Sequence, residues 1–249
     1  MRPFLYEYSL RELRARLGVR LGLAKWLFIH IPKNAGVSIA KHRELYWRMA
    51  RVEAPFLPSR AYLRELLQVL DAAGEHHGIQ HARWRDAHPD VRRKLQPVAV
   101  VRNPWARSVS RYRFARPAIE NGKAAPGYVP NSFEALLEER HKYGNRPFYW
   151  HRAIRGWYPQ ADYVTDETGR IVAELLRQEN LEEEAARYFG LKTPLRRRNV
   201  STSGQGRSYA DYYTAKTIQI VADWYEKDIE LFGFDFDTPA RRNCFFGAD

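Results

Sequence analysis

Two short runs of the chain are almost continuously apolar, which is typical of strands that are buried on both faces. Residues 26–31 read WLFIHI and end at Pro32, and residues 97–101 read PVAVV and end at a polar turn. Continuous rather than alternating apolar positions indicate strands covered by helices on both sides. Each run is followed by a turn and a segment of helical periodicity, which predicts a parallel sheet with crossover helices.

Helical periodicity marks much of the remaining chain. Helices are predicted at residues 9–23, 37–49, 62–73, 108–114, 132–143, 180–189 and 210–231. Residues 162–165 and 170–175 flank a glycine-containing turn, which predicts a hairpin or strand pair. No linker rich in Pro, Gly or Ser divides the chain. We therefore expect residues 1–249 to form one α/β domain with a central, mainly parallel sheet flanked by helices.

Residues 1–25 predict a helical extension of this domain. In the helix at 9–23, the leucines at positions 10, 13, 17 and 21 share one side, and arginines occupy the others. Such a stripe usually packs on its own domain, which is our prediction, and a membrane-surface helix is the alternative. No stretch approaches the roughly 20 apolar residues of a transmembrane helix, and no signal peptide is apparent. We therefore expect a cytoplasmic protein.

The chain is strongly basic. Its 41 Lys and Arg residues exceed its 29 Asp and Glu residues, which leaves a net charge of +12. Such a surplus attracts anionic ligands, and a nucleotide, an acidic polysaccharide, a nucleic acid or an anionic membrane all satisfy it. No nucleic-acid-binding motif is apparent, so we expect no nucleic-acid partner. Cys244 is the single cysteine, so no internal disulfide forms, and Cys/His metal spacing is absent.

The first candidate site follows the first predicted strand, where residues 30–39 read HIPKNAGVSI. A strand, a tight loop and a helix start present free backbone N–H groups to a phosphate. Gly36 allows the backbone to approach the ligand, Lys33 adds an ammonium group and Ser38 adds a hydroxyl. The lysine precedes the glycine, so this is not the GxxxxGK[ST] loop of ATP-binding proteins. A purely structural turn is the alternative.

The second candidate site follows the second predicted strand, where residues 102–114 read RNPWARSVSRYRF. Arg102 comes at the carboxyl end of the strand, where open α/β sheets bind their ligands. Ser110 lies on the helix that follows the Asn-Pro turn. We expect the Arg102 guanidinium and the Ser110 hydroxyl to hold one phosphate together. A solvated, arginine-rich helix is the alternative.

Together the two segments resemble the sulfotransferases that use 3′-phosphoadenosine 5′-phosphosulfate (PAPS). HIPKNAGVSI is similar to their 5′-phosphosulfate loop, typically HIPKTAGTSI, and VVRNPWARSVSRYRF is similar to their 3′-phosphate segment, typically VRNPxxRxxSxYRF. The carbohydrate branch, with its heparan, chondroitin and dermatan enzymes and bacterial relatives, is the most similar. The resemblance covers residues 26–236, including YPQADYV, the run ENLEEEAARYFGL and the final YEKDIELFGFDF. It implies a P-loop-kinase-like sulfotransferase fold.

The resemblance also implies a reaction and a set of binding residues. A sulfuryl group would pass from PAPS to an acceptor hydroxyl, on a sugar by likeness to the carbohydrate branch, without a metal. Lys33 would meet the 5′-phosphate and the negative charge that develops there. Asn34 and Val37 stand where the family commonly has Thr, and Val37 removes one hydroxyl donor. The residues expected to contact the nucleotide are Lys33, Asn34, Ala35, Gly36, Val37, Ser38, Arg102, Ser110, Arg207 and Tyr209.

The acceptor hydroxyl needs a general base. Residues 75–81 read EHHGIQH, and histidine accepts a proton near neutral pH. Family members often use a His or a Glu in this role. We expect His81 to be the base, with His77 as the second candidate and Glu44 as the third.

A basic loop at 196–207 has glycines that permit movement and arginines that suit phosphate. We expect it to close over the nucleotide, with Arg207 and Tyr209 in contact, and an exposed basic loop is the alternative. Two other functions remain open at this point. One is a nucleotide-dependent kinase of related fold, against which the missing GxxxxGK[ST] loop argues. The other is a non-catalytic module that binds 3′-phosphoadenosine 5′-phosphate (PAP) or a polyanion.

Overall fold

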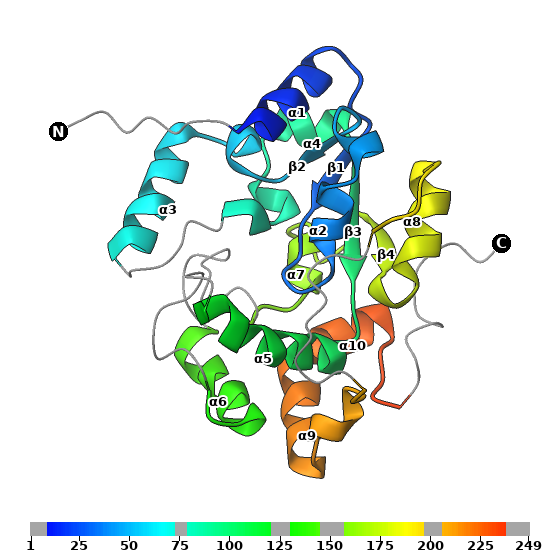
Figure 1. Ribbon diagram of the computed structural model, residues 1–249. Coiled ribbons are helices and arrows are strands. Elements are labelled where there is room, and N and C mark those ends of the chain that lie inside the picture. Colours follow the sequence, from blue (N-terminus) through cyan, green and yellow to red (C-terminus); the bar gives the residue numbers. More distant parts are fainter. Residues whose placement is uncertain (1–8, 73–78, 121–129, 145–156, 197–205, 238–249) are drawn as a thin grey trace.

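The computed structural model describes residues 9–72, 79–120, 130–144, 157–196 and 206–237, which are coloured in Figure 1. Its sheet consists of the parallel strands β1 (Trp26–Ile29), β2 (Met49–Arg51), β3 (Gln96–Val101) and β4 (Glu174–Arg177). The spatial order is β2-β1-β3-β4, so the two strands expected from the sequence lie side by side at the centre. The predicted α/β class with a parallel sheet is confirmed.

Helices surround this sheet. They are α1 (Leu10–Arg20), α2 (Gly36–Ala40), α3 (Arg60–Ala72), α4 (Pro89–Lys94), α5 (Pro104–Glu120), α6 (Phe133–Tyr143), α7 (Ala161–Val164), α8 (Leu181–Phe189), α9 (Ala215–Trp224) and α10 (Glu226–Phe232). Short 3₁₀ turns lie at Arg43–Leu45, Ala54–Phe56, Ile79–His81, Trp84–Asp86, Gln178–Asn180 and Ala210–Tyr212. The helices predicted at 62–73, 132–143 and 180–189 are confirmed as α3, α6 and α8.

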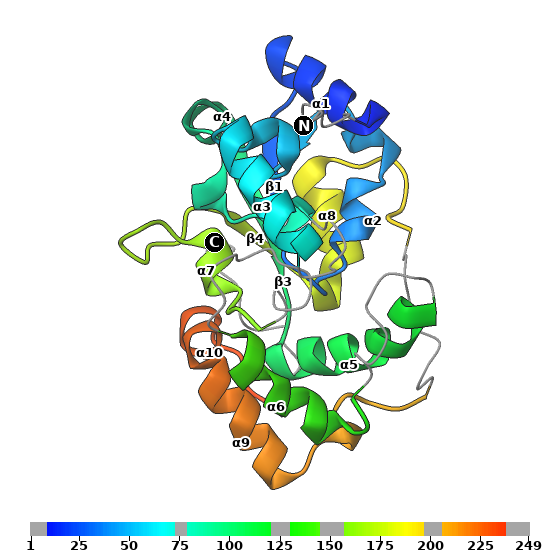
Figure 2. The ribbon, with the colours of Figure 1, turned by 90° about the vertical axis from the view of Figure 1, so that its left-hand side faces the viewer.

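Side chains along the strands alternate between two faces, and each face has its own core. Phe28, Val98 and Leu176 pack with residues of α2 and α8, which lie together on the right in Figure 2. Leu27 and Ala99 point the other way, into a larger core to which α3, α5, α6 and α10 contribute. Because both faces are covered, the strands are apolar throughout, as the sequence pattern indicated.

Two predicted helices are shorter than expected because tertiary contacts override the local pattern. The helix expected at 37–49 ends at Ala40, since Met49–Arg51 pair with β1 as strand β2. The helix expected at 210–231 is broken into α9 and α10 at Tyr225, whose ring is buried. A local periodicity cannot reveal that residues 49–51 pair with β1 or that the ring of Tyr225 is buried.

The predicted hairpin at 162–175 is wrong in its first half. Residues 161–164 form helix α7, because the Asp228 carboxylate of α10 accepts the N–H groups of Gln160 and Ala161 at 2.9 and 2.8 Å. These are the donors that a helix start leaves without partners. The turn itself is present, and a single antiparallel bridge joins Thr165 to Ile171.

Helix α1 forms as predicted, but the side that packs on the domain is not the leucine side. Ser9 and Glu12 make a reciprocal capping box at its start. Its buried residues are Glu12, Ala15 and Gly18, and the leucine stripe faces outward. The prediction that the stripe packs on the domain is therefore wrong.

Close contact explains the orientation of α1. A Cβ atom on Gly18 would lie 2.4 Å from the carbonyl oxygen of Trp47, so only glycine permits this approach. Arg11 donates to Glu53 at 3.2 Å, and Glu53 also pairs with the buried Arg51. Small residues and an ion-pair network thus set which face of α1 packs inward. Among the described residues, no helix is long and apolar enough to cross a membrane.

The packing of α1 predicts a large effect on stability at one position and almost none at the next. Gly18→Val forces a side chain into the Trp47 backbone, and we expect it to lower the free energy of unfolding by about 1–3 kcal/mol. Leu17→Ala shortens an exposed side chain and should change that free energy by less than about 0.5 kcal/mol. Urea denaturation measures both, with amide hydrogen exchange of α1 as the local readout. A larger loss in Leu17→Ala than in Gly18→Val would contradict this orientation.

Candidate nucleotide-phosphate site

The loop between β1 and α2 contains two residues in the left-handed backbone conformation. Lys33 has a φ of 68° and Ala35 a φ of 57°, and no other non-glycine residue of the described segments has a positive φ. Each costs about 1–3 kcal/mol, and such strain clusters at ligand-binding sites. In the described part of the chain, the N–H groups of Ala35, Gly36 and Val37 donate no hydrogen bond to another main-chain group. This turn therefore offers main-chain donors to an anion.

Gly36 is required by packing within the protein. A Cβ atom on this residue would lie 2.1 Å from Cδ2 of the His30 ring. The sequence suggested that Gly36 lets a ligand approach the backbone, and the structure adds that it lets the loop lie against His30. The His30 ring in turn stacks on Phe28 of β1, with ring centroids 5.8 Å apart. The loop is thereby held against the central strand.

Asn34 directs its side chain into the protein. This residue is only 1% exposed, and its Nδ2 donates to the carbonyl oxygen of Val100 at 2.7 Å and to Oε1 of Gln160 at 2.6 Å. The expected contact of Asn34 with a nucleotide is therefore limited to its main chain. Because Val100 belongs to β3, the side chain ties the first loop to the neighbouring strand.

Arg102 brings the second segment into direct contact with the first. Its Nη1 donates to the carbonyl oxygen of Lys33 at 3.2 Å, and its Nε is buried without a partner. Burial lowers the pKa of Arg102 to about 10, the positive charges of Arg113 and Arg107 add to this effect, and Glu179 opposes it. The guanidinium stays charged at neutral pH. An unpaired donor among like charges fits a site for an anion.

The start of helix α5 is already capped. The Asn103 side chain accepts the N–H groups of Trp105 at 3.0 Å and Ala106 at 3.2 Å, while its own Nδ2 donates to the carbonyl oxygen of Asp235. Pro104 occupies the first helical position, where its missing N–H costs nothing. The expected Asn-Pro turn is thus an N-cap. Any anion bound here depends on side chains rather than on the end of this helix.

The polar residues along α5 divide into two groups. Arg107 is 2% exposed and donates to the carbonyl oxygens of Pro32 and Tyr158 at 3.2 and 3.0 Å, so it holds the first loop in place. Ser110 is half-buried and shares a helix face with Arg113, three residues further on. Arg113 donates to the Tyr212 hydroxyl at 3.2 Å and to the carbonyl oxygen of Arg207 at 2.9 Å, so its guanidinium already has partners in the protein.

Lys33 also touches this helix. Its ammonium group lies 3.8 Å from the centroid of the Phe114 ring, at the far end of the second segment. A lysine over an aromatic face makes a cation–π contact, which is stronger where water is excluded. Lys33 is therefore positioned between the first loop and α5. Both segments expected to bind phosphate meet at this side chain.

Gln160 joins the two loops, and sequence reasoning missed its role. Its Oε1 accepts from Asn34 at 2.6 Å and from the N–H of Arg102 at 2.9 Å. Its Nε2 donates to the carbonyl oxygen of Arg102 at 2.7 Å and to Asp228 at 3.1 Å. Gln160 is fully buried, and burial raises the pKa of Asp228. The sequence offered only a likeness around Pro159 and Gln160, without a structural reason.

His81 lies against the first loop. Its Nδ1 is 2.7 Å from the carbonyl oxygen of His30, and the two imidazole rings are 4.4 Å apart. Because a carbonyl oxygen only accepts, Nδ1 must carry a proton, which leaves the Nε2 lone pair of the neutral ring as the acceptor. This is the tautomer that a general base requires at Nε2. In this tautomer Nε2 of His81 accepts a hydrogen bond from the amide nitrogen of Gln80 at 3.4 Å, which an acceptor hydroxyl would replace.

The other base candidates are less well placed. Glu44 accepts hydrogen bonds from Lys192 and Thr193, and the Thr193 hydroxyl is the main reason that the pKa of Glu44 falls to about 2. A carboxylate of that acidity is a poor acceptor for an alcohol proton. Its contacts indicate a structural role in holding residues 192–193. His77 lies outside the described residues.

Of the two residues expected to contact the nucleotide from the basic loop, only Tyr209 has its side chain engaged elsewhere. The Tyr209 hydroxyl donates to the carbonyl oxygen of Phe236 at 2.5 Å, and burial raises its pKa. Arg207 has an exposed side chain, and its carbonyl oxygen accepts from Arg113 of α5 at 2.9 Å. Residue 207 is therefore beside α5, whereas the Tyr209 hydroxyl is directed to the C-terminal segment. Most of the predicted loop at 196–207 lies outside the described residues.

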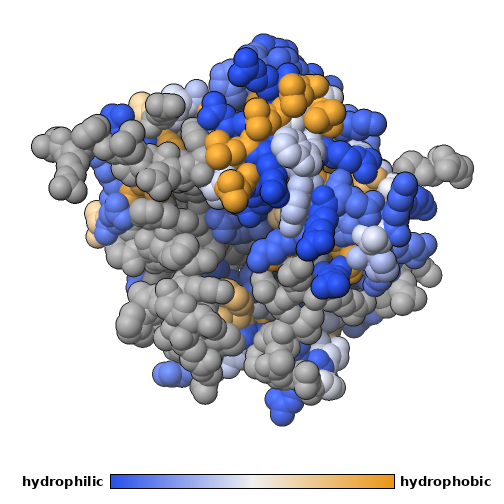
Figure 3. Space-filling model, turned by 45° about the horizontal axis from the view of Figure 1, so that its top comes forward, coloured by the Kyte–Doolittle hydropathy of each residue, from blue (hydrophilic) through white to orange (hydrophobic). Residues whose placement is uncertain are grey.

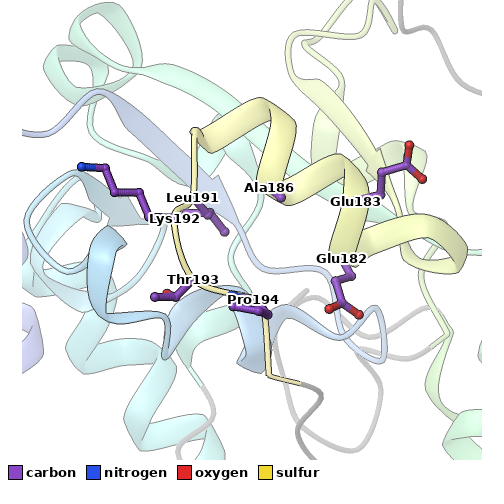
Figure 4. Close-up of a pocket in the computed structure, with 7 residues that line it drawn as sticks. All are labelled: Glu182, Glu183, Ala186, Leu191, Lys192, Thr193 and Pro194. Atoms are coloured by element: carbon purple, nitrogen blue, oxygen red, sulfur yellow. The ribbon is translucent and has the colours of Figure 1, made fainter.

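A separate open pocket of about 460 Å³ lies between α8 and residues 191–194. Figure 4 shows Glu182 extending toward Pro194 and Glu183 pointing away from that segment. None of the predicted nucleotide-binding residues lines this pocket, and its two carboxylates would repel a doubly phosphorylated ligand. Among the described residues, no group of three His, Cys, Asp or Glu side chains could hold a metal ion.

Neither a scan against protein-family models nor a search of curated proteins produced a match to this chain. The family resemblance therefore rests on the two motifs and on the residues that surround them.

The hydrogen bonds of the buried Gln160 amide predict that replacing this side chain lowers the free energy of unfolding of the protein. Gln160→Leu leaves the Asn34 amide, the Arg102 N–H and Asp228 each short of a partner, so we expect a loss of about 3 kcal/mol or more in the free energy of unfolding. Gln219→Leu, at an exposed position of α9, is the matched control and should cost less than about 0.5 kcal/mol. Equal urea denaturation midpoints for the two variants would contradict the role of Gln160 in holding the two loops together.

Proposed function

We propose that this protein is a PAPS-dependent sulfotransferase with the sulfotransferase variant of the P-loop-kinase-like fold, acting on a hydroxyl group of a carbohydrate. The motifs HIPKNAGVSI and VRNPWARSVSRYRF support the choice of donor, because each resembles one phosphate-binding segment of that family. The parallel sheet supports it as well, since β1 and β3 are neighbours and both segments leave their carboxyl ends.

One contact carries the proposal. The Arg102 guanidinium donates to the carbonyl oxygen of Lys33 at 3.2 Å, so two segments 69 residues apart meet at the same edge of the sheet. PAPS carries phosphate at both its 5′ and 3′ positions, and a protein that binds it must hold two anionic groups at a fixed separation. Lys33 on the first segment and Arg102 on the second provide one cation for each of the two phosphates, which suits that requirement.

The residues divide the work as follows. Lys33 and the main-chain N–H groups of Ala35, Gly36 and Val37 bind the 5′-phosphate, with the hydroxyl of Ser38 beside them. Arg102 and Ser110 bind the 3′-phosphate. Fixed donors of this kind favour the reaction by positioning the donor and by stabilising charge as it develops.

The transfer itself is an in-line displacement at sulfur. The acceptor oxygen forms a bond to sulfur while the bond from sulfur to the bridging phosphate oxygen breaks, and PAP leaves with the electron pair. The acceptor proton passes to Nε2 of His81, whose Nδ1 hydrogen bond to His30 holds the ring in the required tautomer. Lys33 stabilises the negative charge on the departing phosphate. No redox step is involved.

The proposal predicts separate effects on the two phosphates. Arg102→Ala and Ser110→Ala should weaken PAP binding, by about 10–100-fold for the arginine, because each removes a donor to the 3′-phosphate. Neither should have a comparable effect on adenosine 5′-phosphate, which lacks that group. Lys33→Ala should weaken both ligands and lower the transfer rate by about a hundredfold or more. Isothermal titration calorimetry and transfer of labelled sulfate from PAPS to a panel of sugars measure these effects.

Lys41→Ala and Arg43→Ala are the controls, because both residues are exposed and lie just beyond the first loop. They should leave affinity and rate within about twofold of the wild type, apart from a small electrostatic effect. Absence of any heat on adding PAP to the folded wild type would refute the proposed function. Turnover of ATP with magnesium, and none of PAPS, would indicate a kinase instead.

His81 predicts a defect in turnover rather than in binding. His81→Gln should lower kcat by about a hundredfold or more while PAP affinity stays within about twofold. His88→Gln, in the exposed cap of α4, should change neither value. A His81→Gln enzyme with normal kcat would remove His81 from the mechanism and leave the nucleotide assignment intact.

A further inference from the structure

Helix α1 presents an apolar surface that is exposed among the described residues. The leucine face, as we call it, consists of Leu10, Leu13, Leu17, Leu21 and Leu23 together with Trp47, which are 41–74% exposed. In Figure 3 the leucines of this face form an orange band on the upper part of the molecule. Large apolar residues scattered singly on a surface are ordinary, but a contiguous row marks a site of interaction.

The orientation of this face is firmly set. Ala15 and Gly18 hold the opposite side of α1 against the domain, and the Arg11–Glu53 pair anchors its rotation. The leucines therefore cannot turn inward without breaking the contact between Gly18 and Trp47. The exposure is part of the packed structure, so the face needs another environment to cover it.

The charge around the leucine face indicates what that environment is. Arg14 and Arg20 flank the stripe on either side, and Arg16 lies next to Arg20 around the helix, all three exposed. Lys25, two residues after Leu23 in the chain, is exposed as well. The one acidic residue of α1, Glu12, is buried and engaged with Ser9. The apolar row therefore has a basic border without exposed acidic residues of its own helix.

We propose that α1 docks the protein onto an anionic membrane surface. A helix with leucines on one face and arginines at the border is suited to lie in the interface, with its apolar side among the acyl chains and its cations at lipid phosphates. Trp47 belongs to the residue type that favours the same depth. A symmetric contact between two copies of the chain would instead bring the arginines of one α1 against those of the other.

Docking in this way leaves the candidate nucleotide site accessible. Figure 1 places α1 at the end of the molecule where β1 begins, whereas the two phosphate loops follow the carboxyl ends of β1 and β3. The bilayer would therefore lie at one end of the sheet and the nucleotide at the other. The inference does not depend on the proposed function, because it concerns a surface that none of the predicted phosphate ligands forms.

Flotation of the full chain with lipid vesicles tests the proposal. The wild type should float with vesicles of 30% phosphatidylserine in phosphatidylcholine and remain unbound with pure phosphatidylcholine. Leu13→Gln combined with Leu17→Gln should weaken binding by about tenfold or more, because two apolar side chains no longer enter the interface. Arg14→Gln combined with Arg20→Gln should weaken it by about fivefold for each arginine.

Lys142→Gln combined with Arg187→Gln is the matched charge control, since it removes two exposed cations from α6 and α8. It should bind almost as the wild type does, and circular dichroism should show all variants folded. No binding to the anionic vesicles, or equal binding by the leucine variant, would overturn the proposal. A dimer in light scattering that the leucine substitutions dissociate, without vesicle binding, would overturn it in favour of self-association.

Discussion

The candidate site depends on one buried carboxamide. Gln160 accepts two hydrogen bonds at its oxygen and donates two from its nitrogen, so its capacity is fully used within the protein. Its partners are Asn34 of the first loop, both main-chain polar groups of Arg102, and Asp228 of α10. A group of this kind is costly to bury unless every bond is made, and it therefore specifies a single arrangement of the loops. The hydrogen bonds of Gln160 therefore fix the position of Arg102 relative to the loop that carries Lys33.

The positive charges gathered at this end of the sheet repel one another, which carries an electrostatic cost. Arg107 donates from Nε and Nη1 to the carbonyl oxygens of Pro32 and Tyr158 and so holds the first loop in place, while its Nη2 is buried without a partner. Arg102 keeps an unpaired Nε in a place where burial and neighbouring arginines lower its pKa. Asp228 and Glu179 offset part of the repulsion. A bound phosphate would offset more, which gives the cluster a physical reason to prefer a polyanion.

The described site also shows where motif reasoning overreached. Asn34 belongs to the first motif, yet its side chain faces β3 and supports the loop from inside. Tyr209 was expected above a nucleotide, and its hydroxyl instead anchors the segment at Phe236. A motif identifies which residues are close along the chain. It does not distinguish a side chain that contacts a ligand from one that holds the ligand-binding residues in position.

The sequence alone determined the two central strands, the loops that follow them and several helices, because continuous apolar runs, caps and periodicity are local properties. It could not determine β2, α7 or the direction in which α1 faces. Strand β2 exists through pairing with β1, and α7 through a carboxylate supplied by α10. Helix α1 turned its leucines outward because Gly18 allows a closer approach to Trp47 than any larger residue. Only the tertiary structure decides between two faces of one helix, since the answer lies in the surface that it meets.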